Sequence, residues 1–379
     1  MNKEAAYWIA LAHLPRWGYQ KINNLIIKFY HDNKMPIDEF FSLPENDWEK
    51  NYGLVIKEIE DLKKAKSELA SNAFLAESLL NEGYELIPIT SPDYSGTLKE
   101  NLKAAHAPSL LYVKGNKKIL QEKSIAIVGS RNASDTSLHF TDNVAKLASK
   151  EYKVVVSGFA KGVDKQALDS AILYKGQSII VLPQGIMTFG SGFKTYYKQI
   201  IDGDILVLST FFPKAPWKAE LAMARNPIIY GLASEIYVAE SSEKGGTWSG
   251  VIDGLRKKRI IYVRKPEPSE DNANNLLIQK GAIPVDFNGN PVKEYEDIPS
   301  KVLQTELKEP FTDYENRIFE LLKTGEYTIK DILTRLKLDW PEKKLRDFVK
   351  SQKEIEVIHE KPLRFTLKSG KLKQKTLFD

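Results

Sequence analysis

Cysteine is absent from this 379-residue chain, and histidine occurs only five times. The lack of cysteine excludes disulfide bonds, thiolate nucleophiles and cysteine-based zinc sites, and it fits a reducing compartment. The histidines are scattered, with no pair at the helical spacing that a metal site prefers, so we interpret each as a surface or packing residue. They are His13, His31, His106, His139 and His359. We therefore expect neither a metal nor a cofactor.

Long hydrophobic runs are also lacking. No segment reaches the run of about 18 apolar residues that a membrane-spanning helix needs. The apolar stretch at residues 5–12 is short, lacks a small-residue cleavage site and leads into His13, Pro15 and Arg16, so it predicts a first core helix rather than a signal peptide. We expect a cytoplasmic protein that has no membrane partner.

The excess of one charge is small. The chain has 55 Lys and Arg against 50 Asp and Glu, a formal net charge of +5. A charge this mild does not by itself establish a polyanionic partner, because only its local distribution can do so. A composition of 42% apolar and 28% charged residues is typical of a globular protein, and the length predicts about two or three domains.

Residues 1–84 carry apolar residues at helical spacing, with breaks at Pro15, Gly18, Pro36 and Gly53. This pattern predicts a small helical domain of the helix-hairpin-helix or SAM-like kind. Two interpretations of the turn around Gly18 stay open. It is either a plain connection between helices or a turn whose backbone amides face a phosphate.

From residue 85, strands that are apolar on both faces alternate with helices. This alternation is typical of a parallel sheet covered on both sides, so residues 85–300 are predicted to form an α/β domain, a Rossmann-like doubly wound parallel sheet. Residues 301–379 begin with a charged linker. The pattern after it, three helices and then two short strands, predicts a C-terminal winged-helix domain.

Turns of small and polar residues follow several of the predicted strands. The strand from Ser124 to Val128 leads into Gly129, Ser130 and Arg131, where the free amides of the next helix can face an anion. Three further groups complete the candidate site: Ser157, Gly158, Lys161 and Gly162; Arg225 with Asn226; and Gly245, Gly246 and Thr247.

The physical reason for grouping these residues is the sheet. Glycines allow a backbone to approach a ligand closely, and lysine or arginine supplies the charge that a phosphate requires. Arg131, Lys161 and Arg225 are expected on three different strand-to-helix connections. Since the carboxyl ends of parallel strands share one rim, we expect them to meet in one phosphate-binding cleft. Asp164 is expected only to cap the helix that follows it.

Seven stretches of the chain form a series: residues 91–94, 107–116, 128–131, 157–164, 171–182 with Gly185, 225–232 and 275–282. In motif, order and spacing they resemble the DNA-processing protein A (DprA/Smf) family, and the resemblance covers nearly the whole chain. It implies a protein that binds single-stranded DNA in a basic pocket, forms a homodimer and helps to load the recombinase RecA in natural transformation, without catalysis. By position, Arg131 and Lys161 match basic residues of that pocket. Arg225 and Asn226 match the first two residues of an Arg-Asn-Arg signature.

The chain also departs from the family pattern. Pro227 replaces the third signature residue, and the aromatic residue expected shortly before Arg225 is missing from residues 221–223. The usual Ser-Gly-Ser-Leu turn is Gly245-Gly246-Thr247-Trp248. These departures indicate a divergent member and bear more on the pathway than on the binding chemistry.

Two alternatives remain open from sequence. Residues 244–247 resemble the phosphate turn of lysine-decarboxylase-like phosphoribohydrolases, which cleave a nucleoside monophosphate, although the Arg and Glu pair expected after that turn is not recognisable. A nucleotide sensor in a defence or signalling system would use the same cleft for a small nucleotide. The biological pathway and the oligomeric state stay open as well.

Overall fold

The computed structural model describes residues 4–292, 313–336, 338, 340–352, 355–358 and 363–367. The chain divides into two compact units, Met1–Pro299 and Ser300–Asp379. The predicted boundary at residue 300 lies outside the described residues, and the three-domain division stays a prediction.

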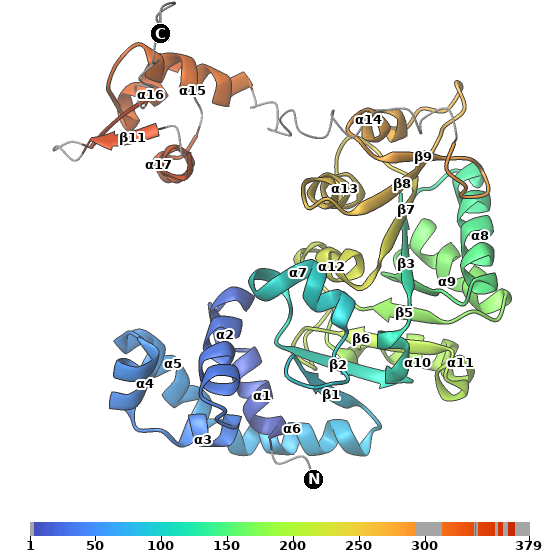
Figure 1. The fold of residues 1–379 in the computed structure, drawn as a ribbon, viewed down its shortest axis with the longest axis horizontal. Coiled ribbons are helices and arrows are strands. Elements are labelled where there is room, and N and C mark those ends of the chain that lie inside the picture. Colours follow the sequence, from blue (N-terminus) through green and yellow to red (C-terminus); the bar gives the residue numbers. More distant parts are fainter. Residues whose placement is uncertain are drawn as a thin grey trace, which may run out of the picture. The chain divides into compact units, whose positions relative to one another are not determined.

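A nine-stranded sheet forms the centre of the first unit (Figure 1). Its spatial order is β1-β2-β6-β5-β4-β3-β7-β8-β9. The pairs from β6 through to β9 are parallel, and only the pairs β1 with β2 and β2 with β6 are antiparallel. The strands are β1 (Glu85–Pro88), β2 (Leu110–Gly115), β3 (Ser124–Gly129), β4 (Val154–Ser157), β5 (Ser178–Val181), β6 (Ile205–Ser209), β7 (Glu235–Glu240), β8 (Ile260–Arg264) and β9 (Ile283–Val285).

Helices cover both faces of this sheet, because its central strands are apolar on both sides. In β3, Ala126 and Val128 belong to the core under α12 and α13, whereas Ile125 and Ile127 belong to the core under α8 and α9. Figure 1 shows these two helix pairs on opposite sides of the sheet. The helices are α7 (Gly96–His106), α8 (Asp135–Lys150), α9 (Val163–Leu173), α10 (Gly190–Thr195), α11 (Tyr197–Asp202), α12 (Ala219–Leu232), α13 (Gly246–Arg256) and α14 (Asn274–Gln279), with 3-10 turns at Lys117–Gln121 and Ile186–Thr188. The predicted α/β fold with a doubly wound, mostly parallel sheet is confirmed.

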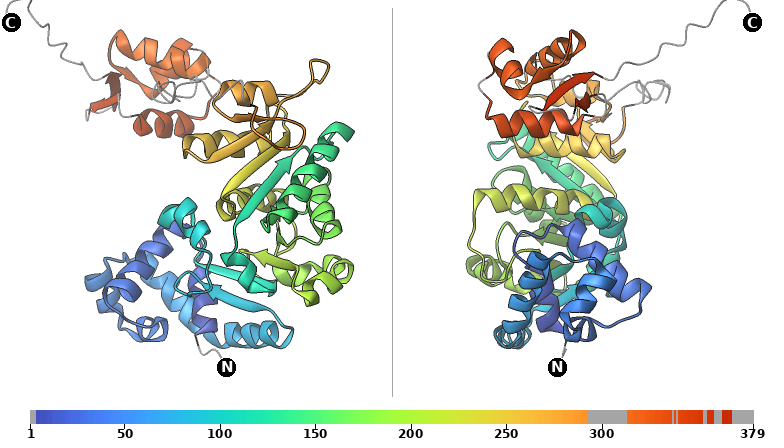
Figure 2. Two further views of the ribbon diagram at one scale, coloured as in Figure 1. Left: turned by 45° about the vertical axis from the view of Figure 1, so that its right-hand side comes forward. Right: turned by 90° about the vertical axis from the view of Figure 1, so that its left-hand side faces the viewer.

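Six helices precede the sheet and lie at its β1 and β2 end (Figure 2). They are α1 (Ala5–Ala12), α2 (Tyr19–Ile26), which continues as a π-helical turn (Ile27–Asp32), α3 (Ile37–Ser42), α4 (Glu45–Tyr52), α5 (Ile56–Ser67) and α6 (Leu69–Asn81). Trp8 and Leu79 of these helices share one hydrophobic cluster with Tyr112 and Ile205 of the sheet. Within the described residues, no helix has both the length and the apolar character needed to cross a membrane.

Sequence patterns did not predict α12 as a helix, and this error changes the site. Pro227 lies inside the helix, where proline removes a backbone N–H from the hydrogen-bond ladder. The helix forms nevertheless because Ile228, Ile229 and Leu232 are buried against the sheet. The sequence predicted Arg225 on a strand-to-helix connection. In the structure it lies in the middle of a helix.

The second unit contains α15 (Asp313–Lys323), β10 (Tyr327–Thr328), α16 (Ile329–Leu336), α17 (Glu342–Ser351), β11 (Ile355–Ile358) and β12 (Arg364–Leu367). Its three strands form an antiparallel sheet in the order β10-β12-β11. Ile318, Ile332, Leu345 and Phe365 are buried in its core. The winged-helix assignment of this unit stays a prediction.

Candidate nucleic-acid interface

The strand order of the sheet reverses between β3 and β7. From β3 the chain adds β4, β5 and β6 on one side and then crosses over to add β7, β8 and β9 on the other. At such a point the loops that leave two neighbouring strands diverge to opposite faces, and ligands of α/β sheets bind in the crevice between them. A pocket of about 410 Å³ opens here, lined by residues that follow β3 and β7 and by residues of α12. We call it the basic pocket.

Most of the expected site residues line the basic pocket. They are Gly129, Ser130, Arg131, Arg225, Asn226, Gly245, Gly246 and Thr247, and the structure adds Asp164, Tyr230 and Lys244. Ser157, Gly158, Lys161 and Gly162 are not among the lining residues. The structure therefore brings residues of three of the four groups together in one pocket. From the segment after β4, the neighbouring Ala160 and Asp164 reach the pocket instead of the four expected residues.

The glycines after β4 allow the pocket wall to pack closely. A Cβ atom on Gly158 would lie 1.4 Å from Nη1 of Arg225, and one on Gly162 would lie 2.3 Å from the carbonyl oxygen of Ser130. Gly162 also has a φ of +77°, which side chains disfavour. Both glycines thus allow residues that line the pocket, Arg225 and Ser130, to pack directly against the backbone of the loop after β4. Lys161 is exposed on the same loop.

Arg225 is the most unusual group in the pocket. Its side chain is buried, with 3% of the residue exposed, and Nη1 lies 3.8 Å from Oδ2 of Asp164. Nε and Nη1 have no hydrogen-bond partner. Burial lowers the pKa of Arg225, yet a guanidinium stays charged in proteins. Since buried donors without partners are costly, the arrangement favours an anionic ligand that supplies the missing acceptors.

Asp164 holds the loop after β4 and does not cap α9. The N-cap of α9 is Gly162, without a side-chain hydrogen bond, so the predicted capping role is wrong. The carboxylate accepts hydrogen bonds from the backbone N–H groups of Gly158 and Ala160. Burial raises the pKa of Asp164, and the neighbouring Arg225 opposes that rise. Of the residues that line the pocket, only Asp164 is acidic.

The start of α8, which sequence favoured as the anion site, is occupied by the protein itself. Ser134 accepts a hydrogen bond from the backbone N–H of Ser137 at 3.3 Å. The carboxylate of Glu240 accepts from the backbone N–H of Ser134 at 3.1 Å and from the hydroxyls of Ser134 and Ser137 at 2.7 and 2.8 Å. The Glu240 carboxylate thus already binds part of this helix end, and its negative charge disfavours a phosphate there.

The start of α13 has the opposite character. Its N-cap is Gly245, with a φ of +97° and no side-chain cap. The first amides of a helix have no partner within it, and they carry the positive end of the helix dipole. Gly245, Gly246 and Thr247 line the basic pocket, together with the exposed cations Arg131 and Lys244. The pocket thus combines the uncapped N-terminus of α13, the buried guanidinium of Arg225 and two exposed cationic side chains. These are the kinds of group that bind phosphate.

Among the residues that the structure describes, no three His, Cys, Asp or Glu side chains are grouped so that they could hold a metal ion.

Comparison with known proteins agrees with the motif series. Residues 85–296, more than half of the chain, match the family described as DNA recombination-mediator protein A. The chain belongs to the DprA/Smf family. DNA processing protein DprA of Streptococcus pneumoniae is 31% identical over 193 residues, which cover 50% of this chain and 68% of that protein. DprA of Bacillus subtilis is 27% identical over 234 residues, covering 61% of this chain and 76% of that one.

The structure of the Streptococcus pneumoniae DprA superposes with a TM-score of 0.60 at 24% identity, covering 75% of this chain and 95% of that chain. This likeness supports the fold. At such identities the protein is a divergent DprA/Smf member, as the replaced signature residues indicate.

Sequence patterns in this DprA/Smf chain did not reveal that Asp164 pairs with Arg225, whereas Lys244 belongs to the turn at residues 244–247 that the sequence had singled out. Asp164 and Arg225 lie 61 positions apart, as their numbers show, and on different elements, and no local pattern reports that they pair. Lys244 carries a weak signal, since it directly precedes two glycines at the end of a predicted strand.

Proposed function

We propose that this protein binds single-stranded DNA by holding backbone phosphates in the basic pocket. The observation that carries the proposal is Arg225, a buried guanidinium whose Nε and Nη1 lack partners beside the uncapped start of α13. Phosphate oxygens supply acceptors for both features at once. Membership of a family described as a DNA recombination mediator supports DNA as the polymer that carries those phosphates.

The finer parts of the proposal come from the family resemblance. We propose a cytoplasmic homodimer that loads RecA onto the bound strand and does not itself turn over DNA or nucleotides. In this view Lys161, exposed on the loop after β4, contacts the strand beyond the pocket. Hydrolysis of a strand or a nucleotide by the pure protein, lost on mutation of the pocket, would contradict the non-catalytic part.

The test is fluorescence anisotropy with a labelled single strand across a salt series. Each phosphate contact contributes about 0.7 to the log–log slope for a single strand, so Arg131→Ala and Lys244→Ala should each lower affinity for every sequence and flatten the slope by about that share. Glutamate at either position should weaken binding further, because it adds a repulsive charge. Lys123→Glu is the matched control, since exposed Lys123 directly precedes β3, at the opposite end of the strand from Gly129.

A second candidate is a protein that binds a free nucleotide. It is favoured by the volume of the basic pocket, about 410 Å³, which falls within the range of about 300–1,000 Å³ typical of small-molecule sites. Titration with deoxynucleotides of increasing length separates the two. Affinity for a strand increases with length until the site is filled, whereas a nucleotide sensor or a phosphoribohydrolase gains nothing beyond one nucleotide.

A further inference from the structure

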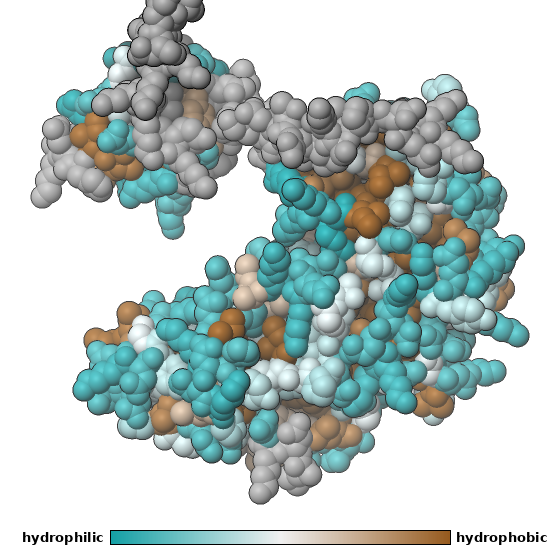
Figure 3. Space-filling model, in the orientation of Figure 1, coloured by the Kyte–Doolittle hydropathy of each residue, from teal (hydrophilic) through white to brown (hydrophobic). Residues whose placement is uncertain are grey.

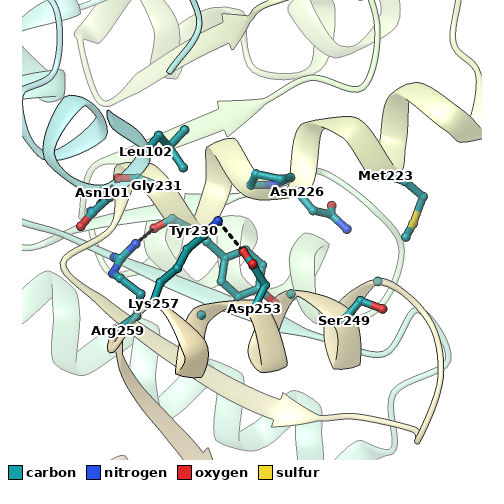
Figure 4. A pocket seen from close by; sticks show the side chains of 14 residues that line it. Asn101, Leu102, Met223, Asn226, Tyr230, Gly231, Ser249, Asp253, Lys257 and Arg259 are labelled. Carbon is teal, nitrogen blue, oxygen red and sulfur yellow. Dashed lines mark hydrogen bonds and ion pairs between the residues drawn. The ribbon is translucent and has the colours of Figure 1, made fainter. Parts of the chain in front are cut away.

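A second, smaller pocket of about 170 Å³ adjoins the basic pocket, between α7, α12 and α13 (Figure 4). Met223, Asn226, Tyr230 and Gly246 line both pockets, so the two lie side by side. Figure 4 shows Met223 and Asn226 of α12 opposite Ser249 of α13 at the shared end, with Arg259 at the other end.

Small residues on α13 create this space. A Cβ atom on Gly250 would lie 2.6 Å from the ring of Tyr230, and one on Gly246 would lie 2.7 Å from Nδ2 of Asn226. The glycines therefore let side chains of α12 lie directly on the backbone of α13. A flat wall made by the Tyr230 ring and a helix backbone follows from this packing.

The charged groups of the second pocket are already paired. Lys257 donates to Asp253 at 2.8 Å, and Arg259 donates to the carbonyl oxygen of Tyr230 at 2.9 Å. Figure 4 shows the Arg259 contact at the end away from Met223 and Ser249, and the Lys257–Asp253 pair in the middle of the pocket, beside Tyr230. The rest of the lining includes Leu102 and Pro227. The pocket thus has an apolar character and offers no free cation to a second phosphate.

We propose that this second pocket holds the base of the nucleotide whose phosphate lies in the basic pocket, and the proposal rests on the strand-binding function above. A nucleotide joins an anionic phosphate to a flat, largely apolar ring with polar edges, and two contiguous pockets, one cationic and one apolar, match that pair. Asn226 stands at the junction and carries both a donor and an acceptor for a base edge. The volume, below the 300 Å³ or so of a drug-sized site, suits a fragment of that kind.

An exposed hydrophobic side chain at the edge of the second pocket also favours a base as the ligand. On the face drawn in Figure 3, hydrophobic residues of the first unit form small patches among hydrophilic ones. Met223, half exposed, is one of the large exposed hydrophobic residues and borders both pockets. A polarisable thioether makes favourable contacts with aromatic rings, and a base presents such a ring.

The experiment uses the full chain, a variant that fills the second pocket, and strands with and without bases. Ser249 is exposed and lines the second pocket but not the basic one, so Ser249→Leu should fold and obstruct the base. Leucine is chosen because an aromatic replacement would itself stack on a base. Ser191→Leu, at an exposed serine near the start of α10, is the matched control. The strands are a labelled oligonucleotide and the same backbone made of abasic sites.

Stacking of a base on an aromatic side chain is worth about 1–3 kcal/mol, as alanine substitutions measure it. The wild type should therefore bind the base-containing strand about 5- to 160-fold more tightly than the abasic one. Ser249→Leu should remove most of that preference while leaving affinity for the abasic strand and its salt slope unchanged. Ser191→Leu should keep the preference. Equal binding of both strands by the wild type, or an equal loss for both strands in Ser249→Leu, would overturn the base pocket alone. If the wild type binds neither strand, the proposed function fails, and the base pocket fails with it.

Discussion

Replacing Arg225 with methionine tests whether the buried pair with Asp164 is real and whether it serves a ligand. Methionine keeps an unbranched side chain of similar reach and removes the charge. Breaking a buried ion pair by removing one partner costs about 3–5 kcal/mol. The Nε and Nη1 atoms of Arg225 are also buried without hydrogen-bond partners. Removing these unsatisfied donors stabilises the folded state by about 1–3 kcal/mol, which offsets part of the loss. The net expectation at pH 7 is a loss of about 2 kcal/mol, or about 4 °C in Tm for a unit of this size.

The pH dependence of that loss gives the sharper result. Burial raises the pKa of Asp164, and Arg225 opposes the rise, so the variant should raise the pKa further. A folded state that binds a proton more tightly than the unfolded state loses stability as pH increases between the two pKa values. The deficit of Arg225→Met against the wild type should therefore be largest at pH 7–8, and it should shrink towards pH 4, where an unfolded Asp is about half protonated.

The assay is a set of thermal melts of both proteins from about pH 4.5 to pH 8, with anisotropy measurements of strand binding at pH 7. Arg131→Met is the control: an exposed cation of the same pocket should change stability by less than about 0.5 kcal/mol while still weakening binding. A deficit that is absent, or equal at every pH, would refute the paired and buried placement of Arg225. Undiminished strand affinity in a folded Arg225→Met protein would refute its role in the pocket.

Two further predictions concern the backbone around the pocket. Gly158→Ala places a methyl group on Nη1 of Arg225 and should displace the guanidinium, with a loss of about 1–3 kcal/mol in melts and weaker strand binding; wild-type affinity would contradict the close approach. Glu240→Gln keeps an oxygen near Ser134 and Ser137 but removes the anion at the start of α8, so Tm should fall by an amount equivalent to about 1 kcal/mol, whereas an unchanged Tm in low salt would show that this contact is solvated.

The sequence predicts the sheet and its helices well where the physics is local. Apolar runs such as Ser124–Gly129 and Ile205–Ser209 indicate strands buried on both faces, and α8 between them has its buried residues at helical spacing. The order of the strands in the sheet cannot be predicted from such local patterns, because it depends on pairing between segments far apart in the chain. That order places the reversal between β3 and β7 and so decides which turns form the pocket.

The helix α12 shows why the candidate site was only partly predictable. Pro227 argues locally for a break, and burial of Ile228 and Ile229 overrides it. Once the segment is a helix, Arg225 is drawn inward to Gly158 and Asp164. The sequence predicts Arg225 at the solvent-facing rim of the sheet, but the structure buries it. Replacing Arg225 is therefore expected to affect stability as well as ligand binding.

The local sequence also does not show which helix N-terminus is free to bind an anion. The turns after β3 and β7 both introduce a helix with small residues, and either helix end is a plausible place for phosphate. Ser134 caps α8 and Glu240 adds a carboxylate there, whereas Gly245 leaves α13 uncapped. Because Glu240 ends β7, the strand beside β3, its position depends on the sheet, and the local sequence of neither turn reveals which helix end is free.

The departure at Pro227 gains a structural meaning from the two pockets. A basic residue in this signature position would add a charge to the lining of the second pocket, which Pro227 borders. With proline there, Arg225 and Asn226 keep their places on the basic pocket, and the adjoining wall stays apolar. Lys244, on the loop after β7, supplies a cation from the opposite side. In the functions that we propose, the signature is thus divided: Arg225 serves the phosphate, Asn226 stands between the two pockets, and the third position sets the character of the pocket proposed for the base.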